Sequence, residues 1–275
     1  MIRLDNASAA LVPGTLFAVS AWYHMRLPVA ALPEVIAKIL LYMLCYILSF
    51  AFSNEIAGVE EDRVNKPHRP IVTGELSMRS ARWHLRTLTV VYLGVAWWLH
   101  VTEWALLWIV TTFLHDRLRF SRHWVLKDLG MFLGTLSMLA AAWEIVAPVP
   151  ADGWRWIITI SCVVFVLIPL QDLRDTAGDI RIGRRTFPIA FGERPTRLFL
   201  AAGFTALPVV VHLVLLAPHG PTSAGLVFGT AMAALNWLTA YRVVALRDVK
   251  ADHLTYLLFC WWYCLATGAS GPAMG

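Results

Sequence analysis

The sequence predicts an all-α fold, a polytopic membrane helical bundle of about nine transmembrane helices that forms one integral-membrane domain over residues 1–275. Three observations support this prediction. Of the 275 residues, 58% are hydrophobic and 15% are charged, whereas soluble domains average about 25% charged residues. Apolar runs fill the whole chain, and charges collect between them. No cleavable signal peptide is expected, because Asp5 accompanies Arg3 and no small-residue cleavage site follows.

The apolar runs define the expected spans. A span needs about 20 residues, and fewer where its polar ends are buried in protein. The run at 104–114 is short, so eight spans are the alternative to nine. Proline and glycine interrupt several runs, which neighbouring helices can accommodate. The expected spans are residues 8–24, 34–53, 83–99, 104–114, 129–148, 155–170, 196–217, 222–241 and 253–268.

Basic residues concentrate in alternate connections. Of the 23 lysine and arginine residues, 19 fall in the connections 54–86, 115–128, 171–197 and 242–252. The positive-inside rule therefore makes these four loops cytoplasmic, with the N-terminus inside and, for nine spans, the C-terminus outside. Three of these residues, Arg79, Arg82 and Arg86, are expected only to set this topology.

The stretch from Asn54 to Gly74 places many charges directly after an apolar run. Ionisable groups beside a span are costly, which makes this stretch a candidate functional site. If the preceding helix continues through it, Asn54, Gly58 and Asp62 share one face, and Glu61 joins them.

A second cluster, at residues 171–185, also follows an apolar run. Its Asp172, Asp175 and Asp179 have the i, i+3, i+7 spacing of one helix face. Two acidic faces at one side of the membrane suit hard divalent cations, and Mg²⁺ binds a few carboxylates together with substrate phosphates. Arginine and lysine in the same loops would hold phosphate oxygens. The charge pattern therefore predicts binding of an amphiphile with a diphosphate head and an apolar tail.

The four cysteines are expected to be buried small hydrophobic residues. Cys45, Cys162, Cys260 and Cys264 each lie inside an apolar run, and their spacing suggests neither a disulfide framework nor a zinc site.

The two clusters together resemble a known family. The pattern N-x₇-D-x₂-N-x-P-x-R-P-I-x₂-G, from Asn54 to Gly74, resembles the first signature of the UbiA superfamily of intramembrane prenyltransferases. The run L-R-D-T-A-G-D-I-R-I-G-R-R-T, with Asp175 and Asp179, resembles the second. The order of the motifs and the nine-span layout agree, so the resemblance covers nearly the whole chain.

The resemblance implies a bundle around a central cavity with cytoplasmic cap loops, where two Mg²⁺ ions bridge an isoprenyl diphosphate to both motifs. It makes Asn54, Asp62, Asp175 and Asp179 metal ligands, with Asp172 just outside the pair. The candidate catalytic residues are Asn54, Glu61, Asp62, Asp175 and Asp179. The full candidate metal set is Asn54, Glu55, Glu61, Asp62, Asp172, Asp175 and Asp179. The candidate diphosphate contacts are Lys66, Arg69, Arg117, Arg119, Lys127 and Arg185.

The first motif departs from the family pattern. Gly58 stands where the family has its middle aspartate, and we hypothesise that Glu61 takes over that role. Val12 replaces a basic residue that often precedes proline in the first span, so that diphosphate contact is missing. The form E-E-D-R-x-N-K-P-x-R-P resembles the branch of the superfamily that cyclises prenyl diphosphates to terpenes.

Three functions remain open from the sequence. The first is cyclisation of farnesyl or geranylgeranyl diphosphate, in a cavity lined by aromatic residues. The second is transfer of the prenyl group to an aromatic or other acceptor, which requires polar groups on the spans. The third is transport or binding of an isoprenoid lipid, which the position of the acids at one membrane face disfavours. Neither a nucleic acid nor an obligatory protein partner is expected. The span residues considered as aromatic lining are Trp108, Trp237, Trp261 and Trp262, and those considered for an acceptor are His24, Glu144, His212 and Asn236.

Overall fold

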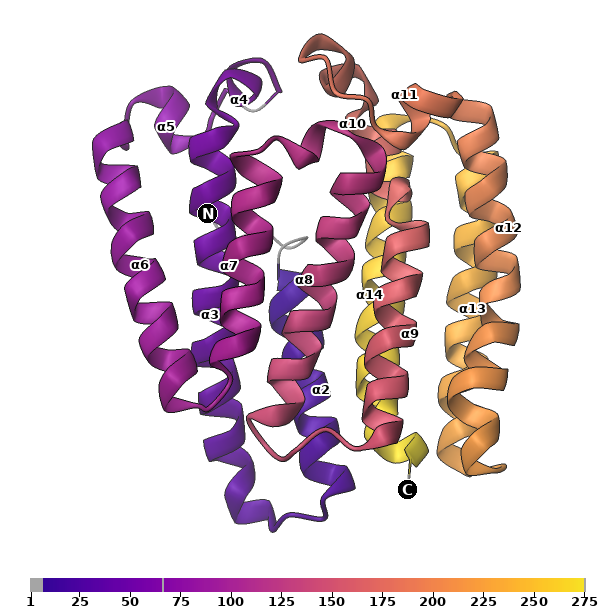
Figure 1. The fold of residues 1–275 in the computed structure, drawn as a ribbon. Helices are drawn as coiled ribbons and strands as arrows, with labels where there is room; N and C mark the ends of the chain where they lie inside the picture. The colour runs from indigo at the N-terminus through magenta and orange to yellow at the C-terminus, as the bar shows by residue number, and fades with distance from the viewer. Residues whose placement is uncertain (1–6, 66, 275) are drawn as a thin grey trace.

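The computed structural model describes residues 7–65 and 67–274, apart from the side chains at positions 7, 8, 61, 64 and 65. Helices make up nearly all of that part, which contains no β-strand (Figure 1). The long helices are α2 (Val12–His24), α3 (Leu32–Ala57), α6 (Met78–Trp98), α7 (Thr102–Asp116), α8 (Trp124–Glu144), α9 (Ala151–Leu167), α12 (Glu193–Val211), α13 (Ser223–Ala245) and α14 (Val249–Met274). The short elements are η1 (Ala7–Leu11), η2 (Val29–Ala31), α4 (Val59–Asn65), α5 (Pro70–Thr73), η3 (Phe120–Arg122), α10 (Pro169–Arg181), α11 (Phe187–Phe191), η4 (His212–Leu216) and η5 (Ala217–His219).

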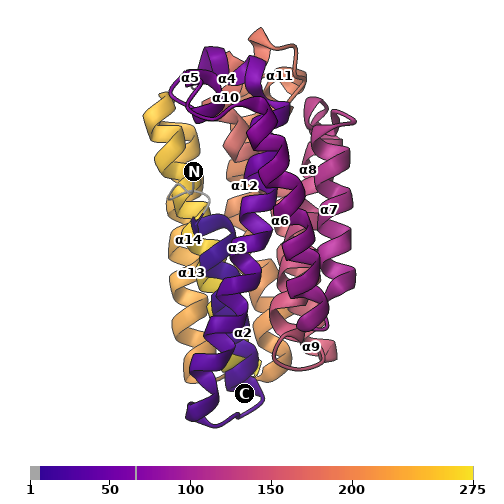
Figure 2. The same cartoon turned by 90° about the vertical axis from the view of Figure 1, so that its left-hand side faces the viewer.

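Each expected span coincides with one long helix, so the all-α prediction is confirmed. Five stretches are long and apolar enough to cross a membrane on length and composition. The other long helices, α2, α6, α7 and α14, pack into the same bundle (Figure 2). Two of them, α2 with 13 residues and α7 with 15, are short for a full crossing. The count of nine spans therefore stays a prediction. The five stretches are Val29–Ala57, Trp124–Glu144, Ala151–Arg181, Glu193–His219 and Ser223–Ala245.

The long helices form a closed ring. Going round it, α3 packs on α6, then α7, α8, α9, α12, α13, α14 and α2, which returns to α3. Helix α2 also contacts α8 across the ring, where the rings of Phe17 and Trp143 lie 5.1 Å apart. Gly271 of α14 allows α2 to come close, because a Cβ there would lie 2.5 Å from the Ser20 carbonyl oxygen. This packing closes the half of the bundle that lies away from α4 and α10.

The basic connections gather at one end of the bundle. Elements α4, α5 and α11 lie there together with the α7–α8 connection, and the C-terminus lies at the opposite end (Figure 1). The backbone of Arg185 joins two of these connections, since its N–H donates to the Arg122 carbonyl at 2.7 Å and its carbonyl accepts from Trp124 at 3.0 Å. The predicted alternation of loops is thus present in the fold, whereas the membrane side that they face remains a prediction.

The cysteines differ in their surroundings. All four are free; Cys45, Cys260 and Cys264 are buried as expected, but Cys162 is exposed on the outside of the bundle. Cys162 therefore behaves as a small apolar residue that faces lipid and not the core of the bundle.

Candidate active site

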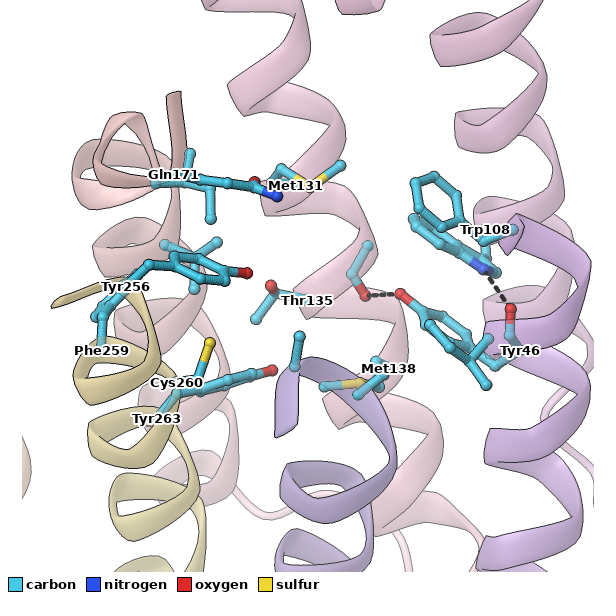
Figure 3. A pocket seen from close by; sticks show the side chains of 17 residues that line it. Tyr46, Trp108, Met131, Thr135, Met138, Gln171, Tyr256, Phe259, Cys260 and Tyr263 are labelled. Carbon is cyan, nitrogen blue, oxygen red and sulfur yellow. Dashed lines mark hydrogen bonds between the residues drawn. The ribbon is translucent and has the colours of Figure 1, made fainter. Parts of the chain in front are cut away.

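A cavity lies inside the ring, beneath the end that carries α4 and α10. Its walls come from η1, α3, α7, α8, α9 and α14, with the start of α10 at its top (Figure 3). Most of its surface is apolar, and none of the described side chains that line it is charged. The central cavity implied by the sequence is therefore present. Its larger apolar lining residues are Ile47, Phe50, Met131, Met138, Val164 and Phe259.

One wall of the cavity is a fixed aromatic stack. The rings of Tyr46 and Trp108 lie 4.4 Å apart and are inclined by only 9°. Trp108 Nε1 donates to the Tyr46 carbonyl at 3.2 Å, and the Tyr46 hydroxyl donates to the Gly134 carbonyl at 3.0 Å. Phe50 extends the wall at 5.3 Å from Trp108. Both polar ends are satisfied within the wall, so the ring faces are what it offers to a ligand.

Of the four span tryptophans considered as aromatic lining, only Trp108 lines this cavity. Trp237 and Trp261 are exposed on the outside of the bundle, and Trp262 is buried in packing against Phe259.

A few neutral polar groups interrupt the apolar lining. Thr135, Gln171, Tyr256 and Tyr263 all border the cavity (Figure 3). The Tyr263 hydroxyl is buried without a hydrogen bond of good geometry in the described part of the chain, and Thr135 is the neighbouring hydroxyl. None of these residues was a candidate from the sequence, because a tyrosine or threonine inside an apolar run is more often a packing residue.

The four polar residues considered for an acceptor do not line the cavity. His24 packs on Trp143, at a ring distance of 5.8 Å, and Glu144 accepts a hydrogen bond from Trp104. His212 is exposed on the outside, and Asn236 is fully buried on α13. The four expected residues therefore cannot form an acceptor site in this cavity. The polar side chains that do line it include Gln171, Tyr256 and Tyr263.

The first acidic motif is not one continuous helix, which corrects the sequence-based expectation. Helix α3 ends at Ala57, and Gly58 adopts φ −95° and ψ 12° before α4 begins at Val59. Two i to i−4 hydrogen bonds still cross the bend, from Gly58 N to the Asn54 carbonyl and from Asp62 N to the Gly58 carbonyl, each 2.8 Å long. The glycine at the family's aspartate position thus bends the motif instead of supplying a ligand.

Beyond the bend, two acids converge on one arginine. Asp62 and Glu55 are both buried, with 3% and 7% of their surface exposed. Arg69 Nη1 lies 2.8 Å from Asp62 Oδ2 and 4.0 Å from Glu55 Oε1. Asn54 is half-buried on the same helix end. Glu61 lies on α4, but its side chain is outside the described part of the structure, and so is the whole of Lys66.

The second acidic motif is α10, which begins at Pro169 directly after α9. Asp172 is fully buried and paired with Lys127 of α8. Asp179 is 2% exposed and lies 3.3 Å from Arg184 Nη1. The predicted common face therefore holds for these two acids, whereas Asp175 is exposed and lies beside Arg174.

The two motifs adjoin, because α4 packs against α10. Among the described side chains, no three histidine, cysteine, aspartate or glutamate groups come close enough together to hold a metal ion. Two buried carboxylate oxygens, Glu55 Oε2 and Asp172 Oδ2, nevertheless make no hydrogen bond within the described part. Such oxygens are the donors that hard divalent cations take. The donor type therefore fits a cation of this class, and Arg69 and Lys127 neutralise part of the carboxylate charge.

The remaining candidate diphosphate contacts lie at the rim. Arg117, Arg119 and Arg185 are exposed, and Arg119 has a positive φ of 59°. Arg174 is an additional basic residue that the sequence did not single out. Its Nη1 donates to His253 at 2.7 Å, and its guanidinium lies 4.6 Å from the centre of the Tyr256 ring. Arg174 thereby joins the acidic helix to the cavity wall, a tertiary contact with no signal in the local sequence.

A membrane-embedded helical ring with an apolar cavity below two acid–base clusters defines a class of intramembrane enzymes. The chain belongs to that class through its family: residues 11–264 match the UbiA prenyltransferase family. It is therefore an integral-membrane enzyme of the UbiA type.

Curated relatives place the chain within the family. It is 44% identical over 269 residues to somaliensene A/B synthase of Streptomyces somaliensis. That alignment covers 98% of this chain and 90% of the relative. It is 33% identical over 266 residues to the diterpene cyclase eriG of Hericium erinaceus. That alignment covers 94% of this chain and 82% of the relative. These names are consistent with the terpene cyclase branch that the first motif resembles.

A solved structure supports the fold. A UbiA homologue from Archaeoglobus fulgidus, bound to DMAPP and Mg²⁺, aligns with a TM-score of 0.70 over 96% of this chain and 97% of that one. The sequence identity is 16%, so this likeness concerns the fold alone.

Proposed function

We propose that this protein is a membrane terpene cyclase, which ionises an isoprenyl diphosphate and closes the released tail into a ring. The observation that carries the proposal is the apolar aromatic cavity directly beneath two adjoining clusters of buried acids and bases. The diphosphate head binds between α4 and α10, and the tail lies in the cavity below. Relatives at 44% and 33% identity that are named synthase and cyclase support it.

The head-binding end supplies opposite charges at short range. Arg69 and Arg184 contact Asp62 and Asp179, so each guanidinium group is held beside a buried carboxylate of its own motif. Arginine binds phosphate oxygens through two parallel hydrogen bonds. Arg117, Arg119 and Arg185 at the rim attract the anionic head toward the mouth of the cavity.

Magnesium is the cation that the proposal adds. Glu55, Asp62, Asp172 and Asp179 would hold it with their carboxylate oxygens, together with Asn54 and Glu61. Bound there, it supplies positive charge against which the diphosphate departs. The Archaeoglobus fulgidus homologue that was solved with DMAPP and Mg²⁺ supports this assignment.

The cavity then determines the fate of the tail. The bond between C1 and the diphosphate oxygen breaks, and its electron pair leaves with the diphosphate. A double bond of the same tail donates its electrons to the resulting allylic cation and forms the ring bond. The Tyr46 and Trp108 ring faces stabilise the cation through their quadrupoles. The described lining holds no charged group that would trap the cation early.

Product analysis without an acceptor tests the proposal. The purified protein would be incubated with Mg²⁺ and geranyl, farnesyl, geranylgeranyl or geranylfarnesyl diphosphate, and organic extracts would be analysed by gas chromatography and mass spectrometry. A cyclic terpene from at least one substrate supports cyclisation. Products that form only after an aromatic acceptor is added would establish transfer instead. Substrate binding without any diphosphate release would leave a binding or transport protein.

A further inference from the structure

A buried histidine–aspartate pair closes α7 at the end that faces the acidic clusters. His115 and Asp116 are 7% and 9% exposed, and His115 Nδ1 lies 2.9 Å from Asp116 Oδ1. An aspartate in this position fixes the orientation and tautomer of an imidazole and stabilises its protonated form. Neither residue has a role in the binding site described above.

The pair lies between the cavity and the diphosphate end. Trp108 and His115 share one face of α7, because they are seven residues apart. Phe50, which lines the cavity, lies 5.3 Å from Trp108 and 5.8 Å from His115. One turn further along α3 stands Asn54, the first residue of the acidic motif. His115 is therefore just above the aromatic wall and just below the head-binding groups.

The orientation of the ring leaves one nitrogen available. Nδ1 faces Asp116, and the Cδ2 edge faces α8, where a Cβ on Gly130 would lie 3.5 Å away. The hydrogen bond of this ring within the part of the chain that the structure describes is made by Nδ1, and Nε2 makes none there. With Nδ1 protonated and donating to Asp116, Nε2 carries a lone pair and is a proton acceptor.

We propose that His115 Nε2 removes the proton that ends the cyclisation, an inference that rests on the proposed function. A terpene hydrocarbon forms when the last carbocation loses a proton from a neighbouring carbon. The C–H electron pair becomes the new double bond, and the proton passes to Nε2. Asp116 stabilises the imidazolium that results. The proton then leaves with the diphosphate or to solvent at the nearby mouth.

The other groups near the tail are poorer bases. The phenols of Tyr46, Tyr256 and Tyr263 are neutral, and a neutral phenol oxygen is a much weaker proton acceptor than an imidazole nitrogen. Gln171 and Thr135 are not basic. The leaving diphosphate and the buried carboxylate of Asp128 on α8, whose Oδ1 makes no hydrogen bond in the described part of the chain, are the remaining competitors. An unchanged product profile in His115→Gln would assign the proton to one of them.

The test compares three variants on the substrate that wild type cyclises. His115→Gln keeps a hydrogen-bonding side chain but cannot accept a proton. Asp116→Asn keeps the size of its side chain but no longer stabilises the imidazolium. His84→Gln is a matched control, because His84 also lies 5.8 Å from an α3 phenylalanine, Phe52, but is exposed on α6. Diphosphate release and every organic product would be quantified together, with thermal melting to check the fold.

The expected result for His115→Gln is about a 10²-fold loss of the wild-type terpene, with diphosphate release lowered less than about tenfold. The missing product should reappear as alcohols or as isomers that lose a different proton. Asp116→Asn should shift products in the same direction, and His84→Gln should not.

An unchanged product profile in His115→Gln, or terpene and diphosphate release that fall in proportion, would overturn the inference. Proportional loss would mean that His115 only holds the diphosphate. If His115→Gln does not fold, an unchanged profile in Asp116→Asn overturns it equally. Failure of the wild type to form any terpene without an acceptor would instead overturn the proposed function.

Discussion

The Trp108 ring packs directly against Gly134, so that a Cβ at position 134 fits only if the ring shifts. A Cβ at position 134 would be 2.4 Å from Trp108 Cζ3 and 3.1 Å from the Tyr46 hydroxyl. The absence of a side chain at Gly134 thus allows both rings to pack against α8. Close helix approach through glycine is common in membrane bundles, and here the glycine itself lines the cavity.

Gly134→Ala should therefore change the products. The added methyl group occupies space on the cavity lining and displaces the Trp108 and Tyr46 rings, at a cost of about 1–3 kcal/mol in folding stability. We expect a smaller share of the largest cyclic product and a lower melting temperature. Gly94→Ala is the control, because nothing in the described part of the chain lies within 4 Å of a Cβ built at Gly94. Unchanged products from Gly134→Ala would show that the wall does not shape the tail.

The acidic clusters should be essential for turnover. Asp62→Ala and Asp179→Ala each remove a buried carboxylate, and EDTA removes the proposed cation; all three should abolish diphosphate release. Diphosphate release is measured with a coupled phosphate assay, and melting curves check the fold. Full activity in EDTA would refute the magnesium requirement.

Glu61 provides a sharper test of the departure at Gly58. We expect Glu61→Gln to lower the rate by orders of magnitude, because it removes a carboxylate charge from the proposed cation. Glu60→Gln is the matched neighbour: Glu60 is exposed and pairs with the exposed Arg63 at 3.0 Å, so its loss should matter little. Equal, near wild-type rates in the two variants would exclude Glu61 as a ligand.

The basic loops should face the cytoplasm. Single cysteines in the loops that contain Asp62, Arg119, Asp179 and Arg247 should react with membrane-impermeant reagents only after permeabilisation, following the positive-inside rule. A background without native cysteines is needed, because Cys162 is exposed. Labelling of the Asp62 or Asp179 loop from outside would show that the orientation is opposite to the predicted one.

The sequence predicts the elements well where local physics decides them. Long apolar runs must be helical in lipid, because every backbone polar group needs an internal partner. Paired acids at the ends of spans predict the candidate site, and Asp62, Asp172 and Asp179 are buried there. The bend at Gly58 could also be anticipated, since glycine lowers the helical preference.

Tertiary relationships lie beyond the reach of a single sequence. Whether Trp108 or Trp262 faces the cavity depends on how the helices pack, since both lie in apolar runs of similar composition. The contact of Arg174 with His253 joins residues far apart in the chain. Whether Glu144 can reach the cavity depends on its position along α8. It lies at the end of the helix, where it bonds to Trp104 instead. Hydropathy alone does not fix any of these positions.

The stoichiometry of the reaction without an acceptor tests the central claim most directly. Terpene formed and diphosphate released would be measured in the same tube with purified protein, Mg²⁺ and a prenyl diphosphate. Our account predicts equal molar amounts of cyclic terpene and diphosphate, and neither product with Asp179→Ala. Diphosphate release that requires an added acceptor, with the prenyl group recovered on that acceptor, would contradict it.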